Sequence, residues 1–512
     1  MTPPQRSRRT AILRRPWLQL AAVLLIYASL VLPTITRQGI SWDEQTDLAI
    51  ARAYLAPNGW LIGSPADPSQ TRLPMFIVAL VFAIFNTTSL ITARLVSVLV
   101  GGLTLVGVFI YGRRLHPLAG LLAGGLLAAN PFFLAFARVA FTETDVYPAC
   151  ALVWLLICAD RLNEQPTLGR AALVGVVLGL ALSAKATMLA VVPVVWFAVG
   201  SSRGWSALAR VGMIALITLL AVVTFFIVPP EHLTNPAILA GLRWRLDHEM
   251  TFNPAFLLEA AALHLLCIVF KSGPLTGAAM LLALALAVVQ WPTRRAIRLP
   301  TLIVLAYGGG LLLLPLAQTF YTIPILPVLT LLLADLFTRW LAQRRKLAAA
   351  LAALALVSTT VDLALCYPDF NLNGYQWVGA RVIAGRPTLG YRSVVQTPSD
   401  GVEQVFQWLN AHAAPGARVR AYVLPWHIVQ AAAPNPHYAI ANGFKDHSPN
   451  PDYVVIEVNA LIPQSWWTRR KADTASIFDP PYDPAWLEQQ YVKVYAVRRA
   501  FGIEMASVWQ KK

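Results

Sequence analysis

Two adjacent carboxylates, Asp43 and Glu44, are the most informative chemical feature of the sequence and lie in the run GISWDEQTDLA. They follow closely on the first long apolar segment, and carboxylates at a lipid–water boundary are costly to place. One of them can act as a general base toward a hydroxyl group. The simpler explanation is that they begin a helix, because negative charge is favourable at a helix N-terminus.

Cations that accompany these acids suggest a phosphate group as the ligand. Arg and Lys neutralise a phosphodiester and make it a good leaving group, so a lipid-linked sugar phosphate would need one general base and several cations. A second carboxylic acid to protonate the leaving group, as in glycoside hydrolysis, is then unnecessary. The polar residues that we place at outer helix ends or in outer loops are Asp43, Glu44, Arg72, Arg94, Arg138, Glu143, Asp145, Lys185, Arg243, Arg245, Lys271 and Tyr321.

The elements that must position these residues are membrane helices. Of 512 residues, 57% are hydrophobic and 13% are charged, and the apolar residues are gathered in long runs typical of an integral membrane protein. The net charge of +16 comes from short basic clusters between these runs, which argues for membrane topology rather than nucleic-acid binding. With a cytoplasmic N-terminus, about eleven transmembrane helices place the clusters inside. We expect them near 17–35, 91–111, 117–136, 144–160, 170–184, 186–200, 207–228, 274–291, 299–316, 319–337 and 347–366.

Two outer loops are expected to lie over the membrane helices. The first loop, 36–90, contains the apolar stretch 73–85, which is short for a span and is predicted to lie as a helix in the interface. Residues 43–55 have helical periodicity and are predicted to form a second interfacial helix. The second long outer loop covers 229–273.

The chain divides into a transmembrane domain, 1–366, and an extracytoplasmic domain, 367–512, which lacks long apolar runs. In the second domain the pattern predicts a helix at 401–411 and strands at 418–424, 452–458 and 491–497, with 503–508 closing a hairpin. We therefore expect a small α/β domain. The four cysteines lie in or beside membrane segments and provide no disulfide framework.

In their order and spacing, these segments resemble a known family of membrane enzymes. SWDEQTDLA, TRLPMF with Arg72, TARLVSVLVGG with Arg94, and NPFFLAFARVAFTETDVY with Arg138 and Glu143 follow one another in this order. GLALSAKATMLAVVP with Lys185 and QTFYTIPILP with Tyr321 come later. Together they resemble the GT-C membrane glycosyltransferases of the family 39-like group, which contains protein O-mannosyltransferases and the lipid A aminoarabinose transferase. The YPDFN segment at 367–371 is similar to that of bacterial members.

The resemblance implies a polytopic helical GT-C fold and transfer of a sugar from a polyprenyl-phosphate donor to a protein, lipid or glycan acceptor. It implies that the reaction takes place on the outer face of the cytoplasmic membrane and inverts the anomeric carbon. Asp43 would be the base and Glu44 a positioning residue. The donor phosphate and sugar would bind to Arg72, Arg94, Arg138, Glu143, Lys185, Tyr321 and Arg243.

A divalent cation, Mg or Mn, would be held by Asp43 and Glu143 if the enzyme uses one. The alternative class is a transporter or lipid-carrier flippase without transferase activity. That class would be expected to carry charged residues near the bilayer midplane and paired repeats.

Overall fold

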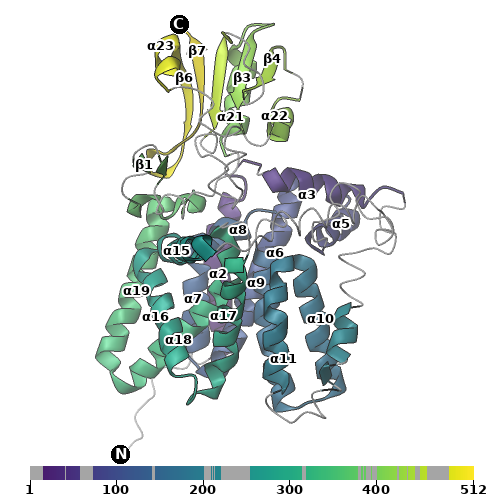
Figure 1. Cartoon of the computed structure of the whole chain (residues 1–512), viewed down its shortest axis with the longest axis vertical. Coiled ribbons are helices and arrows are strands. Elements are labelled where there is room, and N and C mark those ends of the chain that lie inside the picture. The colour runs from purple at the N-terminus through teal and green to yellow at the C-terminus, as the bar shows by residue number, and fades with distance from the viewer. Residues whose placement is uncertain are drawn as a thin grey trace, which may run out of the picture.

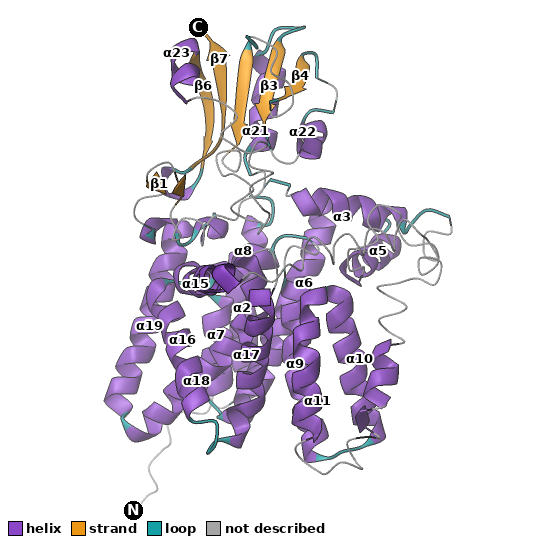
Figure 2. Cartoon of the chain, viewed as in Figure 1, coloured by secondary structure: helices purple, strands orange, loops and turns teal. Residues whose placement is uncertain are grey.

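A bundle of upright helices carries a small α/β domain at one end (Figures 1 and 2). This computed structural model describes residues 15–37, 39–40, 42–57, 73–140, 145–200, 209, 211–212, 214–220, 254–313, 319–378, 382–383, 386–387, 394, 400–423, 426–434, 436–443, 450–457 and 484–512. We call the end of the bundle nearest the α/β domain the domain end, and the opposite one the far end.

Six described helices are long and apolar enough to cross a membrane, or seven if one bent pair forms a single span. Three further predicted spans, 170–184, 186–200 and 274–291, correspond to shorter apolar helices. The predicted span 207–228 lies partly outside the described residues. The helices of the bundle are α2 (Pro16–Val31), α6 (Leu90–Leu115), α7 (Ala119–Ala128), α8 (Pro131–Ala137), α9 (Val146–Glu164), α10 (Leu168–Ala184), α11 (Val192–Gly200), α16 (Pro274–Val289), α17 (Arg298–Leu313), α18 (Leu326–Gln343) and α19 (Arg345–Cys366).

The predicted straight span 117–136 is instead broken into α7 and α8, which meet at 65°. Asn130 begins the second helix because its side-chain oxygen accepts a hydrogen bond from the Phe133 N–H at 3.1 Å. Pro131 occupies the first helical position, where its missing N–H costs nothing. The break turns α8 and the residue that follows it, Arg138, across the domain end of the bundle.

Short 3-10 segments interrupt two other predicted spans at the domain end. Ala186–Val191 precedes α11, and Thr319–Ile325 precedes α18, with Pro324 inside the segment. Proline removes a backbone donor, so the regular helix begins only after it. Both segments place side chains at the domain end, Tyr321 among them.

Helices predicted for the first outer loop are present at the domain end. α3 (Trp42–Ala53) and α5 (Leu73–Phe85) pack against each other beside the top of α6 (Figure 1). The second predicted loop contains a helix, α15 (Pro254–Lys271), which Figure 1 shows almost end-on and therefore transverse to the upright helices.

The α/β domain has a five-stranded mixed sheet with the order β4-β3-β5-β7-β6. β3 pairs in parallel with β4 and β5, whereas β7 pairs antiparallel with β5 and β6. The predicted helix and strands are confirmed; β4, α22 and α23 were not predicted, because these short elements lack clear periodicity. The elements are α21 (Val402–His412), β3 (Arg418–Tyr422), α22 (Trp426–Ala432), β4 (Ala439–Asn442), β5 (Tyr453–Glu457), α23 (Pro484–Gln490), β6 (Tyr491–Arg498) and β7 (Glu504–Lys511), with a small hairpin of β1 (Val382–Ile383) and β2 (Arg386–Pro387).

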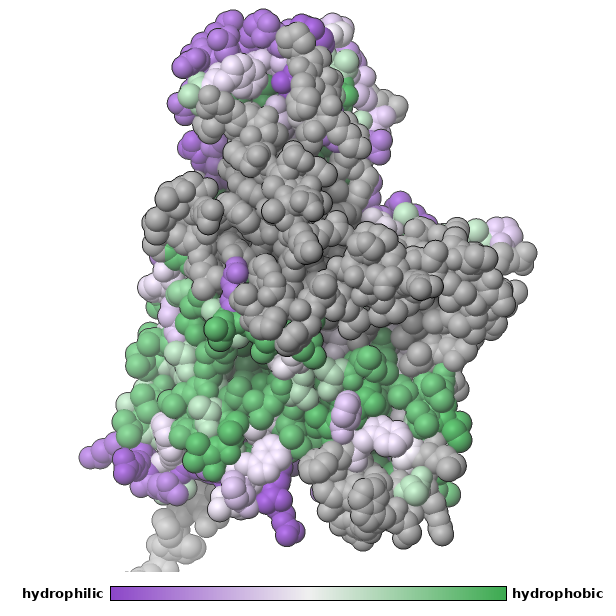
Figure 3. Space-filling view, in the orientation of Figure 1, coloured by the Kyte–Doolittle hydropathy of each residue, from purple (hydrophilic) through white to green (hydrophobic). Residues whose placement is uncertain are grey.

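On the face shown in Figure 3, hydrophobic surface forms a band across the helical part, with hydrophilic residues below it and on the α/β domain. This distribution is expected of a protein whose helices face lipid. The chain is therefore a multi-pass membrane protein.

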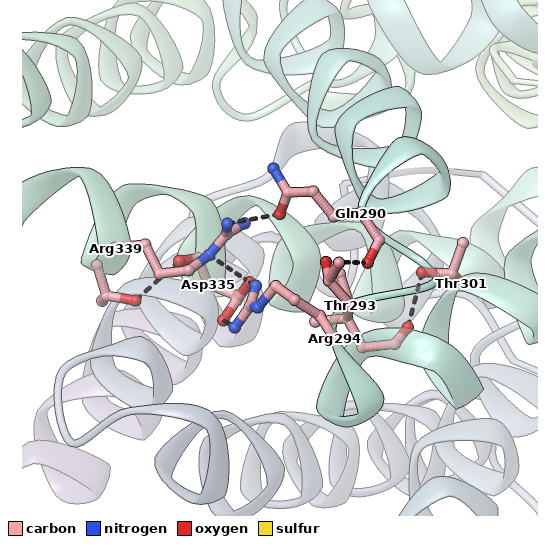
Figure 4. A network of polar contacts seen from close by, with 8 residues as sticks. Gln290, Thr293, Arg294, Thr301, Asp335 and Arg339 are labelled. Carbon is pink, nitrogen blue, oxygen red and sulfur yellow. Dashed lines mark hydrogen bonds and ion pairs between the residues drawn. The ribbon is translucent and has the colours of Figure 1, made fainter.

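Far-end loops are joined by a network around Asp335 of α18 (Figure 4). Arg294 donates to both carboxylate oxygens, at 2.6 and 3.1 Å, and Arg339 donates to one of them at 3.1 Å. Arg339 also donates to Gln290 Oε1 at 2.6 Å, so the network connects the ends of α16 and α18. These basic residues belong to the clusters that the sequence places inside, and their contacts here are structural.

Candidate functional site at the domain end

The carboxylate of Glu44 is fully buried and forms a two-pronged ion pair with Arg94 of α6. Arg94 Nε and Nη2 donate to Glu44 Oε1 and Oε2, both at 2.8 Å. The exposed fractions of the two side chains are 0% and 3%, so neither charge faces solvent. The backbone N–H of Ala140, just after α8, also donates to Glu44 Oε1 at 2.8 Å. Glu44 therefore joins the start of α3 to α6 and to the end of α8.

Arg94 and Arg138 also bind the segment that leads to the acidic pair. We call this segment, residues 34–44, loop 34–44. Arg94 donates from Nη1 to the Ile35 carbonyl at 2.7 Å and from Nη2 to the Gly39 carbonyl at 2.9 Å. Arg138 Nη1 donates to the Thr34 carbonyl at 3.3 Å. The guanidinium group has five N–H donors in a rigid plane, which suits it to such multiple contacts.

The Arg138 guanidinium has further N–H donors besides the one that contacts Thr34. Its Nη1 also reaches the Pro368 carbonyl at 2.6 Å, and its guanidinium lies 4.9 Å from the centroid of the Phe370 ring. Within the described part of the chain, Nε and Nη2 have no hydrogen-bond partner, although the side chain is 1% exposed. Buried donors without partners are costly and call for an explanation, such as a bound water, ion or ligand, or strain.

A second polar group is built around Lys185, which follows α10. Its Nζ lies 2.5 Å from Asp145 Oδ1, just before α9, and 4.0 Å from the centroid of the Tyr321 ring. The Lys185 side chain is 14% exposed, whereas Asp145 is fully buried. Burial raises the pKa of Asp145 to about 7, and the nearby ammonium of Lys185 opposes this rise. Lys185 therefore has a partner whose charge can change near neutral pH, and its own side chain is not fully buried.

Phe320 lies between Lys185 and α8, the helix that precedes Arg138. Its ring stacks on Phe136 of α8 at 5.9 Å between centroids, and Lys185 Nζ lies 5.3 Å from its centroid. α9 begins and α10 ends at the domain end, so Asp145 and Lys185 meet at the same end as Arg138. The convergence expected from the helix count is thus seen for Glu44, Arg94, Arg138, Asp145, Lys185 and Tyr321.

Other predicted site residues lie beyond what the structure describes. The backbone of Asp43 lies in the first turn of α3, and its side chain is outside the described residues. Arg72, Glu143, Arg243 and Arg245 are outside them as well. The prediction that Asp43 and Glu143 hold a metal ion therefore falls on side chains that are not described. Among the described residues, no three His, Cys, Asp or Glu residues are grouped as a metal site would require.

The junction between the domains supplies partners that the sequence did not reveal. Asp369 of the YPDFN segment accepts hydrogen bonds from Arg37 Nε and from the Ala500 N–H, both at 3.0 Å. Lys271, expected among the outer cations, donates to the Asn371 carbonyl at 2.5 Å and is 1% exposed. The only sequence signal was the YPDFN segment itself.

Comparison with known proteins supports a class for this fold. In sequence, residues 69–229 match the family described as dolichyl-phosphate-mannose-protein mannosyltransferase. No curated protein matches the chain. Among solved structures, apo ArnT from Cupriavidus metallidurans is similar with a TM-score of 0.51 and 13% identity, over 98% of each chain.

A weaker similarity is found to the oligosaccharyltransferase AglB from Archaeoglobus fulgidus, in a complex with an inhibitory peptide and dolichol-phosphate. It has a TM-score of 0.49 and 13% identity, over 97% of this chain and 74% of that one. The same organism's enzyme with Zn and sulfate gives a TM-score of 0.48. The fold shared with ArnT is the GT-C fold. Together with the family match over 69–229, this fold supports a GT-C membrane glycosyltransferase.

Proposed function

We propose that the protein transfers a sugar from a polyprenyl-phosphate donor to an acceptor hydroxyl group at the domain end of the bundle. The reaction takes place on the outer face of the cytoplasmic membrane and inverts the anomeric carbon. The family match over residues 69–229 and the shared fold support the class of reaction. The observation that carries the proposal is the Lys185 side chain at this end, which is 14% exposed and whose ammonium lies over the Tyr321 ring.

Lys185 and Arg138 are assigned to the donor phosphate. Lys185 can turn from Asp145 to a phosphate oxygen, and Arg138 has two donors without partners in the described structure. Both charges stabilise the polyprenyl phosphate as it leaves, which lowers the barrier in a poorly solvated site. Tyr321 contributes a hydroxyl group beside them, and Arg72 and Arg243 remain further candidates for the same anion.

Asp43 is assigned as the general base that takes the proton of the acceptor hydroxyl as its oxygen attacks the anomeric carbon. The bond to the phosphate oxygen breaks on the opposite face of the sugar, so the anomeric configuration inverts. Glu44 and Arg94 are assigned as positioning residues, because they bind each other and Arg94 also binds the backbone of loop 34–44. We therefore do not place Arg94 on the donor phosphate.

A divalent cation belongs to this proposal only as a hypothesis. Glu44 is a poor ligand for it, since both of its oxygens accept hydrogen bonds from Arg94. Asp43 and Glu143 are the residues that would hold the ion, and it would supply positive charge for the donor phosphate. Loss of activity with a chelator, restored by Mg²⁺ or Mn²⁺, would support the hypothesis.

The test uses purified protein, a labelled polyprenyl-phosphate sugar and a panel of protein, lipid and glycan acceptors. Asp43→Asn should abolish both sugar transfer and release of the lipid phosphate. Asp452→Asn is the matched control, because Asp452 is half-exposed in the α/β domain, beside Arg418. If the wild type transfers no sugar from any donor and releases no lipid phosphate, the proposed function is wrong.

Lys185→Met provides the second arm of the test. Loss of one charge-assisted hydrogen bond, worth about 1.5 to 3 kcal/mol, should lower kcat/KM for the donor roughly 10- to 150-fold. Lys493→Met is its control, because Lys493 has the same kinds of contact, an ion pair with Glu504 at 2.9 Å and an aromatic ring at 4.7 Å, on the α/β domain. An equal effect of the two variants would remove Lys185 from the donor site.

A further inference from the structure

Asp369 connects three parts of the chain that are far apart in sequence. It follows α19, and its carboxylate oxygens accept separately from Arg37 of loop 34–44 and from the Ala500 N–H between β6 and β7. The Asp369 side chain is 6% exposed and that of Arg37 43% exposed. The membrane domain, loop 34–44 and the α/β domain therefore meet at one carboxylate.

A neighbouring ion pair fixes the part of the α/β domain that Asp369 contacts. Arg499, next to Ala500, donates to both oxygens of Asp400, at 2.9 and 3.3 Å. The two side chains are 7% and 2% exposed, so the pair is almost fully buried. Gly401 follows with φ +87°, where a side chain would be strained, and α21 begins at the next residue. The turn at Ala500 and the start of α21 are thus joined by a buried ion pair.

The start of α21 reaches loop 34–44 at a second point. Glu403, in the first turn of α21, lies close enough to the Ile40 backbone and to the Glu44–Arg94 pair for both to affect the pKa of its carboxyl group. Burial raises the pKa of Glu403, while the charge of Arg94 opposes the rise. α22 of the same domain packs against α3, the helix that carries Asp43 and Glu44.

Loop 34–44 is consequently held from two sides. Arg94 and Arg138 bind its carbonyl groups from the membrane domain, at Ile35, Gly39 and Thr34. From the side of the α/β domain, Asp369 accepts a hydrogen bond from the Arg37 side chain, and Glu403 lies beside the Ile40 backbone. Asp43 is only three residues beyond Ile40, so a shift of the loop moves the base. A displacement of about 1 Å in a reacting group can cost about 100-fold in rate.

We propose that Asp369 and Glu403 are positioning residues through which the α/β domain holds Asp43 in its reactive place. The α/β domain thereby acts in the chemical step and not only as a covering for the membrane domain. This inference rests on the proposed function for its kinetic consequence, but its structural consequence can be measured without any activity.

The experiment compares Arg37→Met, Asp369→Asn and Glu403→Gln with the wild type in the full-length protein. Arg37→Met removes the junction contact from its more exposed side, so the fold should tolerate it. The matched control is Glu504→Gln, which breaks a partly exposed ion pair of the same domain on the β6–β7 hairpin. Transfer kinetics and hydrogen–deuterium exchange of loop 34–44 are measured for each variant.

The three junction variants should lower kcat about 10- to 100-fold with less than about a twofold change in the KM for the donor. Their amides at 35–40 should exchange faster, and Glu504→Gln should change neither quantity. Unchanged exchange in all three variants, or an equal effect of Glu504→Gln, would overturn the inference. If the wild type transfers no sugar while exchange still rises in the junction variants, the proposed function fails but the positioning contact stands.

Discussion

Glu44→Gln should destabilise the protein through Arg94 rather than remove a catalytic group. The substitution leaves the size of the side chain but removes the negative charge opposite a guanidinium that is 3% exposed. Breaking one side of a buried ion pair costs about 3 to 5 kcal/mol. With an unfolding entropy of roughly 1 kcal/mol/K for a chain of this length, the Tm should fall by about 3 to 5 °C.

Arg94→Met should be the more damaging change at the same pair. It leaves the Glu44 carboxylate buried without its partner and also removes the donors to the Ile35 and Gly39 carbonyls. Each carbonyl left unsatisfied adds about 1 to 3 kcal/mol. Loop 34–44 should then lose its hydrogen bonds to α6, so both the sugar-transfer activity and the Tm of the protein should fall.

The assay is thermal unfolding in detergent at one scan rate, combined with sugar transfer below the transition. Glu504→Gln, at a partly exposed pair worth about 1 kcal/mol or less, is the control and should shift the Tm by no more than about 1 °C. The reasoning is refuted if Glu44→Gln abolishes transfer while its Tm equals that of the wild type. Glu44 would then act on the substrate and not on Arg94.

Two further predictions concern the other polar groups. The raised pKa of Asp145, about 7 against 3.8, means that the folded state takes up a proton between about pH 4 and 7 that the unfolded chain does not. The stability that this group contributes is therefore present at low pH and lost as the pH rises through 7. Asp145→Asn should flatten this part of the Tm–pH curve. An unchanged curve would contradict the raised pKa of Asp145. At the far end, Asp335→Asn weakens the contacts of Arg294 and Arg339 and should lower the free energy of unfolding by about 1 to 3 kcal/mol. The KM for the donor should not change, and a large change in KM would contradict a structural role for Asp335.

The positions of most helices could be predicted from the sequence alone, because a chain in lipid must satisfy its backbone hydrogen bonds within each segment. The length of the apolar stretch 73–85 predicted a helix too short for a span, and α5 has 13 residues. The break at Asn130-Pro131 was missed because hydropathy continues across it, although Asn followed by Pro is a common helix start. β4 was missed since its four residues are too few to show alternation.

The site was predictable only in part. Residue types and helix parity indicated that the acidic pair, Arg94, Arg138 and Lys185 meet at one end of the bundle. The roles of the arginines could not be read in this way, because an Arg that binds a phosphate and an Arg that binds carbonyl groups are identical in sequence. In the structure Arg94 binds Glu44 and the carbonyl groups of loop 34–44 and is 3% exposed, whereas the Lys185 side chain is 14% exposed.

Sequence by itself determined that this protein is a membrane bundle with a small α/β domain and an acidic pair at the helix ends nearest that domain. Those features depend on composition and on periodicity along the chain, which are local. The tertiary structure alone decided that Glu44 is a buried partner of Arg94, 50 residues away, and that Arg37 meets Asp369 across 332 residues. Such pairings depend on how packed helices bring distant segments together, and no local pattern specifies which partner a charge will find.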